Sequence, residues 1–164
     1  MGKEISIKFQ QFLLVTVASF IFLLSIYGRK IQELLTSVID SYWIAATVFT
    51  VLFLVILYLL YQRKSNATPL WPICLSLFIL VSMAAAVYYK YLVPIEAVHL
   101  LVFSLFGWLA ATVLGLVKAL VTVFLISTGD ELLQYYLPDR VGDIHDVVVN
   151  LLSGVAGVVL RDKC

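Results

Sequence analysis

Six long apolar runs, separated by short polar segments, constrain the fold of this chain more than any other feature. A transmembrane helix needs about 20 predominantly apolar residues, and each run approaches that length. Hydrophobic residues make up 63% of the 164-residue chain, which leaves little sequence for a separate soluble domain. We therefore predict an all-α polytopic transmembrane helix bundle, a single domain over residues 1–164 with short loops. The six predicted helices cover residues 9–27, 42–61, 70–89, 95–114, 118–137 and 144–160.

The segment between the first two runs is polar, yet apolar residues recur in it at helical spacing. This pattern predicts either a short amphipathic helix at the membrane interface near residues 30–40 or an extension of a neighbouring span. The first run is followed by Gly28, Arg29 and Lys30 instead of a small-residue cleavage site. We therefore expect it to be a retained span and not a signal peptide.

Charge and cysteine content exclude two classes of protein. The net charge is only +1, and no basic patch is interleaved with aromatic residues, so a nucleic-acid partner is not expected. The two cysteines, Cys74 and Cys164, suit neither a disulfide framework nor a metal-binding knuckle.

The distribution of basic residues favours a topology with both termini in the cytoplasm. In an arrangement of six spans, the side that holds the N-terminus receives most of the lysines and arginines. We expect a multi-pass protein of the cell membrane whose loop between the last two runs is extracytoplasmic and lies on a net negative side. The basic residues on the inner side are Lys3, Lys8, Arg63, Lys64, Lys118, Arg161 and Lys163, and those on the outer side are Arg29, Lys30, Lys90 and Arg140.

The densest group of ionisable residues lies between residues 130 and 150. Charged groups at membrane depth are costly unless they are paired or used, which marks this stretch as the candidate site. Pro138 ends the fifth predicted helix, and Glu131 lies about 10 Å further down it at about 1.5 Å per residue. We therefore expect Glu131 to face the interior of the bundle. The candidate residues here are Asp130, Glu131, Gln134, Arg140, Asp143, Asp146 and Asn150.

Helical spacing relates these residues to one another. Gln134 shares a helix face with Asp130 or Glu131, and Asp143 is a good N-cap for the last helix. Arg140, in the short loop between the helices, can fork onto a carboxylate or a phosphate. One stripe of polar and small residues runs down the last helix, and we expect it to pack against the fifth helix. The stripe consists of Asp146, Asn150, Gly154 and Gly157.

Glu96 and His99 form a second polar pair, one turn apart at the start of the fourth predicted helix. A single histidine in such a helix is more often satisfied by a neighbouring helix than used as a ligand. In the predicted topology, however, Glu96 and His99 lie on the same side of the membrane as Glu131 and Asp146. We therefore predict that they share one chamber with the residues of the 130–150 stretch.

The order of these motifs resembles that of the VanZ-like family of integral membrane proteins. The residues that carry the resemblance are PIEAVHLLVF, then DELLQ, then a proline and an arginine two apart, then DVVVNLLSG, over about residues 94–160. The family is named after an accessory protein of glycopeptide antibiotic resistance, so the resemblance implies a polytopic cell-envelope protein. Asp139 stands where the family often has glycine, which adds a negative charge to the loop. By resemblance, the family's motif positions are Glu96, His99, Glu131, Gln134, Arg140, Asp146 and Asn150.

Three functions fit these residues, and the sequence leaves all three open. The polar site can bind a membrane lipid, a lipid-linked or cell-wall component, or a partner membrane protein or second copy, with a link to glycopeptide resistance. It can instead belong to a membrane-embedded hydrolase or transferase acting on a lipid headgroup. Such an enzyme would use a divalent cation, which the carboxylates and His99 suit, or Glu131 and His99 as acid and base. Thirdly, it can be a purely structural network between helices. No nucleophile motif or phosphate-binding loop assigns a catalytic residue.

Overall fold

The computed structural model describes residues 2–62, 71–89, 94–140 and 142–163, and within these ranges the chain is helical with short connections. This confirms the predicted all-α bundle with about six helices. The third helix begins at Trp71, so the start predicted for it at residue 70 lies outside the described residues. The elements are α1 (Gly2–Val38), α2 (Ser41–Gln62), α3 (Trp71–Tyr88), the short 3₁₀ helix η1 (Pro94–Glu96), α4 (Ala97–Leu114), α5 (Leu116–Tyr136) and α6 (Ile144–Lys163).

Five of these helices are long and apolar enough to cross a membrane, so the chain is a membrane protein. Their outer surfaces carry large exposed apolar side chains, such as Phe12 and Phe78, as lipid-facing surfaces do. The remaining helix, α5, was also predicted to span the membrane. It falls outside this group because it contains Lys118, Asp130 and Glu131, so its crossing stays a prediction. The five candidate spans are Ile7–Val38, Ser41–Tyr58, Trp71–Tyr88, Ala97–Leu114 and Ile144–Arg161.

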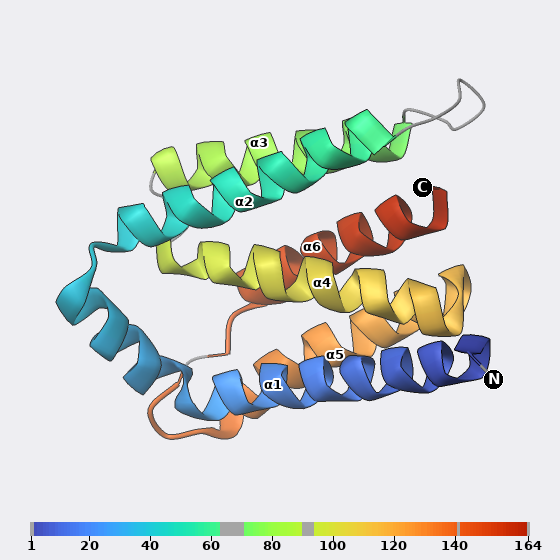
Figure 1. The fold of residues 1–164 in the computed structure, drawn as a ribbon. Coiled ribbons are helices and arrows are strands. Elements are labelled where there is room, and N and C mark those ends of the chain that lie inside the picture. The colour runs from blue at the N-terminus through green and yellow to red at the C-terminus, as the bar shows by residue number, and fades with distance from the viewer. Residues whose placement is uncertain (1, 63–70, 90–93, 141, 164) are drawn as a thin grey trace.

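The six α-helices alternate in direction, and both termini lie at the same end of the bundle (Figure 1). Helices α4 and α6 pack side by side in the middle, with α1 and α5 on one side and α2 and α3 on the other. Buried residues such as Ile21, Phe103 and Val123 join α1, α4 and α5, while Val48, Met83 and their neighbours join α2, α3 and α4. Helix α4 therefore contacts both halves of the bundle.

A single glycine reverses the chain between α4 and α5. Gly115 has a φ of 78°, a conformation that side chains other than glycine rarely adopt. Its N–H donates to the carbonyl of Ala111 at 3.2 Å, and this bond ends α4. Because the reversal is so tight, the start of α4 and the end of α5 lie at the same end of the bundle. His99 on α4 is thereby brought to the level of Asp130 on α5.

The stripe on α6 packs against α4 as well as against α5, the neighbour that was predicted for it. A Cβ atom at Gly157 would overlap the backbone carbonyl of Ser104, and one at Gly107 would overlap that of Gly154. Small residues allow this approach of two helix backbones inside a membrane. Gly154 also faces α5, where a Cβ atom would overlap the side chain of Val123. The stripe on α6 is therefore shared between two neighbours.

Residues 30–38 are part of α1, so the separate interfacial helix predicted near residues 30–40 does not form. The alternative that the pattern left open, an extension of the first span, is what the structure shows. Neither proline nor a pair of glycines interrupts this part of the chain, and a single Gly28 does not stop a helix. Figure 1 shows the last part of α1 bending away from the line of its first part. This part covers the polar end of the bundle.

Candidate functional site

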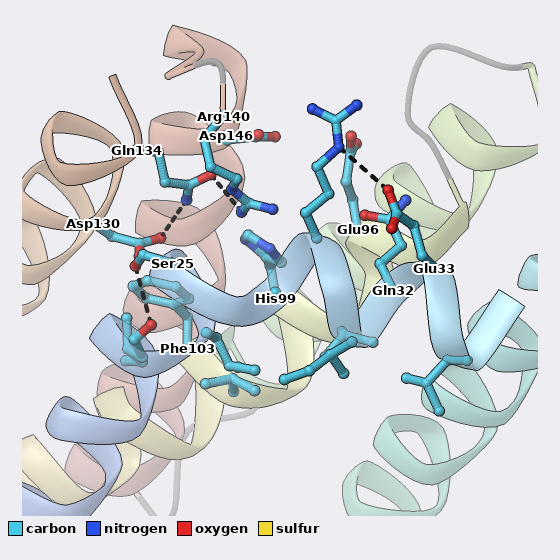
Figure 2. A pocket seen from close by; sticks show the side chains of 18 of the residues that line it. Ser25, Gln32, Glu33, Glu96, His99, Phe103, Asp130, Gln134, Arg140 and Asp146 are labelled. Carbon is cyan, nitrogen blue, oxygen red and sulfur yellow. Dashed lines mark hydrogen bonds and ion pairs between the residues drawn. The ribbon is translucent and has the colours of Figure 1, made fainter. Parts of the chain in front are cut away.

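A cavity of ≈ 440 Å³ lies at the end of the bundle opposite the termini, between α1, α4, α5 and the loop that follows α5. One wall is apolar and is formed by residues of α1 and α4, among them Ile21, Leu24 and Phe103. The other wall is polar (Figure 2). Its side chains are Ser25, Arg29, Gln32, Glu33, Glu96, His99, Asp130, Gln134, Asp139, Arg140 and Asp146.

Two adjacent carboxylates, Asp130 and Glu131, are the most deeply buried acidic groups of this site. Their exposed fractions are 2% and 4%. Asp130 accepts a hydrogen bond from the hydroxyl of Ser25 on α1, and Glu131 accepts one at 3.2 Å from the backbone N–H of Asp143, ahead of α6. The two carboxylates therefore connect α5 to α1 on one side and to α6 on the other.

Two amide side chains bridge the carboxylates. The Gln134 nitrogen donates to Asp130 at 3.3 Å and to Glu131 at 3.1 Å. The Asn150 nitrogen donates to the same two residues at 3.2 and 3.4 Å. The amide oxygens are used as well, since that of Gln134 accepts from Arg140 at 2.6 Å and that of Asn150 pairs with His99 Nδ1 at 2.8 Å. Each amide thus links the buried carboxylates to a basic side chain on the cavity wall.

The hydrogen bond to Asn150 determines the tautomer of His99. An amide oxygen can only accept, so His99 Nδ1 carries a hydrogen and the neutral ring keeps a lone pair on Nε2. The ring stacks on Phe103 with 6.3 Å between centroids, and both residues line the cavity. Figure 2 shows the nitrogens of His99 and the Arg140 guanidinium pointing into the same space. His99 can therefore act as a base or a ligand toward a bound molecule.

The loop between α5 and α6 brings Arg140 back over the cavity. Leu137, next to Pro138, has extended backbone angles that end α5. Gly142 follows, where a Cβ atom would overlap the carbonyl oxygen of Glu131, so only glycine lets the loop approach α5 this closely. Asp143 then accepts a hydrogen bond at 2.9 Å from the N–H of His145, as expected for a residue that begins a helix.

Helix α1 contributes residues that the sequence did not single out. Ser25 binds Asp130, and Arg29 donates to the backbone carbonyl of Asp139 at 2.7 Å while pairing with Glu33 at 3.5 Å. Gly28, between them, lies against the Arg140 guanidinium. Ser25, Gly28 and Arg29 share one helix face, which is the only signal in the sequence that could have grouped them.

The structure gathers nearly all of the predicted site residues. His99, Asp130, Glu131, Gln134, Arg140 and Asn150 form one hydrogen-bonded network, and Glu96 and Asp146 line the cavity beside it. Asp143 is the exception, because its exposed side chain lies outside the cavity and only its backbone reaches Glu131.

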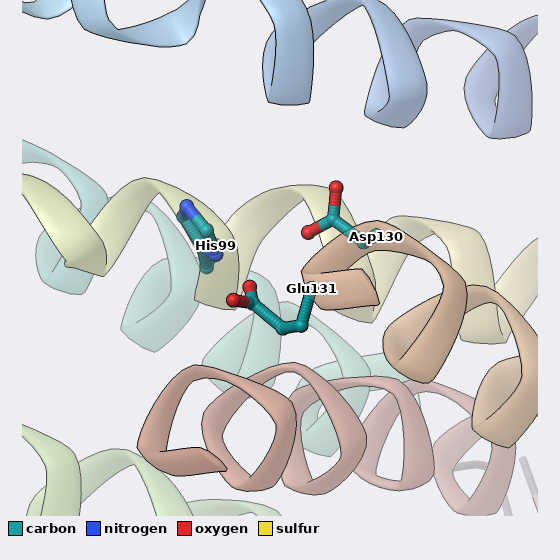
Figure 3. A group of neighbouring side chains, drawn as sticks. All are labelled: His99, Asp130 and Glu131. Atoms are coloured by element: carbon teal, nitrogen blue, oxygen red, sulfur yellow. The ribbon is translucent and has the colours of Figure 1, made fainter. Parts of the chain in front are cut away.

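One group in this network has the composition of a metal site. His99, Asp130 and Glu131 each offer one ligand atom, and these atoms lie within 4.8 Å of one another (Figure 3). A nitrogen and two carboxylate oxygens suit zinc or manganese.

Comparison with known proteins supports the family resemblance. A family model described as VanZ/LLP1 matches residues 9–161. The match includes α1, α2 and α3, where the sequence motifs gave no resemblance. Comparison with the curated proteins and with the solved structures finds no match.

Proposed function

The chain belongs to the VanZ/LLP1 family, and from that premise we propose that its cavity binds the polar end of a lipid-linked component of the cell envelope. The observation that carries this proposal is that one cavity has an apolar wall and a polar wall. A volume of ≈ 440 Å³ is in the usual range for a small-molecule site. The apolar wall suits the first part of a lipid chain, and the polar wall suits its headgroup.

The charged residues of the cavity indicate what the headgroup carries. Arg29 and Arg140 come from different elements and both reach the polar wall, where arginine is well suited to a phosphate or a carboxylate. Glu96 and Asp146 share this wall and would repel a purely anionic group. A headgroup with one anionic group and several donors, such as sugar hydroxyls or an amine, satisfies both sets of residues.

The test measures binding of farnesyl phosphate, and of farnesol without the phosphate, to the full-length protein in detergent micelles by calorimetry. We expect Val102→Phe, which fills the cavity, to weaken binding of farnesyl phosphate at least tenfold. Val121→Phe adds the same volume on an exposed position of α5 and should leave affinity unchanged. Equal affinities for the two variants, or for the two probes, would count against the proposal.

A matched pair of charge variants distinguishes a specific contact with the headgroup from nonspecific attraction of anions by the protein. Arg140→Gln should weaken binding of farnesyl phosphate at least tenfold, because a hydrogen bond to a charged group contributes about 1.5–3 kcal/mol. Lys118→Gln removes the same charge near the start of α5, at the other end of that helix, and should have no effect. The same loss in both variants would mean that the bundle attracts anions without a defined site.

A membrane-embedded hydrolase or transferase is the second candidate, and the geometry of His99 favours it. Asn150 holds the ring so that Nε2 keeps a lone pair beside the cavity, as in a general base oriented by another residue. Release of inorganic phosphate from farnesyl phosphate by the purified protein tests it. His99→Gln should lower the rate by about 10²–10⁴. A wild-type rate no higher than that of this variant would exclude His99 as the base.

Two further parts of the proposal concern the cell. The termini share one end of the bundle, which supports a topology with both on the same side of the membrane. The excess of basic residues expected on that side favours the cytoplasm for the termini and the outside for the cavity. A reporter fused after Cys164 should therefore be active only inside the cell.

If the bound component is also the target of glycopeptides, expression of the wild type should raise the inhibitory glycopeptide concentration, and Val102→Phe should not. An unchanged concentration with both would remove the link to resistance.

A further inference from the structure

We propose that His99, Asp130 and Glu131, with the amide oxygen of Asn150, bind one zinc ion at the inner end of the cavity. This site goes beyond the proposed lipid binding, because it depends on different atoms and needs no lipid. The residues come from α4, α5 and α6, so the ion would also join the three helices that carry the family resemblance.

The geometry of the group is close to that of a bound ion. Zinc binds nitrogen and oxygen ligands at about 2.0–2.2 Å in a tetrahedral arrangement, so two of its ligands lie about 3.4 Å apart. The candidate atoms lie within 4.8 Å of one another, and a contraction of at most about 1.4 Å brings them to that separation. Side-chain rotation alone can supply a movement of this size.

Charge gives an independent reason for a cation. Among the described residues, every hydrogen bond to Asp130 and Glu131 comes from a neutral group: the hydroxyl of Ser25, the amides of Gln134 and Asn150, and the N–H of Asp143. Arg29 pairs with Glu33 instead of with either of these carboxylates. Two adjacent carboxylates buried without a cation are costly, and a divalent ion between them removes that cost.

Asn150 occupies the centre of the group at present. Its oxygen lies 2.8 Å from His99, and its nitrogen donates to both carboxylates. An entering cation takes over the two contacts of the nitrogen. The hydrogen of His99 then moves from Nδ1 to Nε2, so that Nδ1 and the adjacent Asn150 oxygen can both bind the ion. His99 and Asp130 both line the cavity, so the ion has a route of entry and keeps one side open to a bound molecule.

The mixed donor set predicts the order of affinity among metals. Imidazole favours zinc, whereas magnesium prefers a shell of oxygens only, so affinity should fall from zinc to manganese to magnesium.

The experiment uses untagged full-length protein in detergent micelles with Cys74→Ser and Cys164→Ser, since Cys74 is exposed and would bind zinc itself. After treatment with a chelator and dialysis against zinc, mass spectrometry counts the metal. We expect one ion per chain, and cobalt in its place should give visible absorption bands.

Variants identify the ligands. The double variant Asp130→Asn, Glu131→Gln and the single variant His99→Ala should each weaken zinc binding more than tenfold. Glu33→Gln and Asp139→Asn remove carboxylates from the same cavity but outside the group, and should bind zinc like the wild type. Zinc bound equally by all of these variants would overturn the proposal, as would a wild type that binds none.

Asn150→Asp keeps the test decisive if the loss variants fail to fold. It replaces the fourth donor by a carboxylate, so zinc should bind at least tenfold more tightly and should raise the melting temperature of this variant more than that of the wild type. Without a metal site, the change only adds a third buried negative charge, and zinc would give no such rise. Because farnesyl phosphate is absent throughout, the result is independent of the lipid-binding test.

Discussion

Two cavities flank α4, and they differ in volume and in the polarity of their walls. The cavity of ≈ 440 Å³ lies beside His99, Val102 and Phe103 and has a charged wall. On another face of α4, Leu101 and Trp108 line a cavity of ≈ 170 Å³ between α2, α3 and α6, and its walls are almost entirely apolar. The difference comes from the partners of α4, since the end of α5 and the loop after it reach only the first cavity. The charged side chains described for the two cavities therefore gather on one side of α4.

The largest expected effect comes from breaking the polar network at Asn150. Asn150→Leu removes the donor to Asp130 and Glu131 and the acceptor for His99 at once. His99 loses its bond to Asn150, and each buried carboxylate loses one of its three donors, which together should cost about 3–5 kcal/mol of unfolding free energy. Titration with dodecyl sulfate in mixed micelles measures this loss. Ser76→Ala, beside the apolar cavity, removes a hydroxyl that bonds only within α3, to Pro72, and should cost less than about 1 kcal/mol. Similar losses of unfolding free energy in the two variants would contradict the idea that the polar network stabilises the bundle more than the apolar cavity's surroundings do.

Gly157→Ala should have the next largest effect and acts on the apolar side. The added Cβ atom would overlap the carbonyl of Ser104, which belongs to a helix backbone and cannot move aside as a side chain can. Forcing α4 and α6 apart should cost about 1–3 kcal/mol by the same titration. Gly129→Ala is the control, because a Cβ atom there meets only the Phe22 ring at 3.6 Å. It should change stability by less than about 1 kcal/mol, and an equal loss would contradict the close packing of α4 and α6.

The sequence grouped most of the polar side chains of the cavity, but not those that α1 contributes. Asp130, Glu131, Gln134 and Asn150 could be grouped because helical spacing and a short loop limit where they can lie. Nothing comparable linked Ser25 or Arg29 to them. Both come from α1, more than 100 residues earlier, and no loop length determines which face of α1 turns toward α5.

The way the helices pack explains the other points at which the structure differs from the predictions. The stripe on α6 was assigned to α5 alone because the loop between the two helices is short, but Gly107 allows α4 to approach the stripe closely as well. The extension of α1 was also ambiguous, because amphipathic spacing in residues 30–38 suits a helix on a membrane surface or over a protein cavity equally well. The ranges of α2 and α4 followed directly from their apolar runs, which begin and end at polar residues or glycine.

Leu101→Phe and Val102→Phe compare the two cavities with neighbouring residues on α4. Leu101 lines the apolar cavity and Val102 the polar one, so each substitution adds volume to one cavity only. Both should change unfolding free energy by less than about 1.5 kcal/mol, because free space receives the added atoms. Only Val102→Phe should weaken binding of farnesyl phosphate. A loss of binding in Leu101→Phe would show that the ligand reaches both sides of α4.

The smallest expected effect on stability is that of Arg29→Gln at the rim of the polar cavity. The Arg29 and Glu33 side chains are 58% and 69% exposed, so their ion pair should contribute less than about 0.5 kcal/mol to folding. Arg29 also donates to the carbonyl of Asp139 and so ties α1 to the loop that carries Arg140. Its loss should therefore weaken binding of farnesyl phosphate severalfold while the melting temperature stays the same. Glu33→Gln removes the pair but keeps the bond to Asp139, and unchanged binding in this variant would assign the effect to Arg29 itself and not to its ion pair.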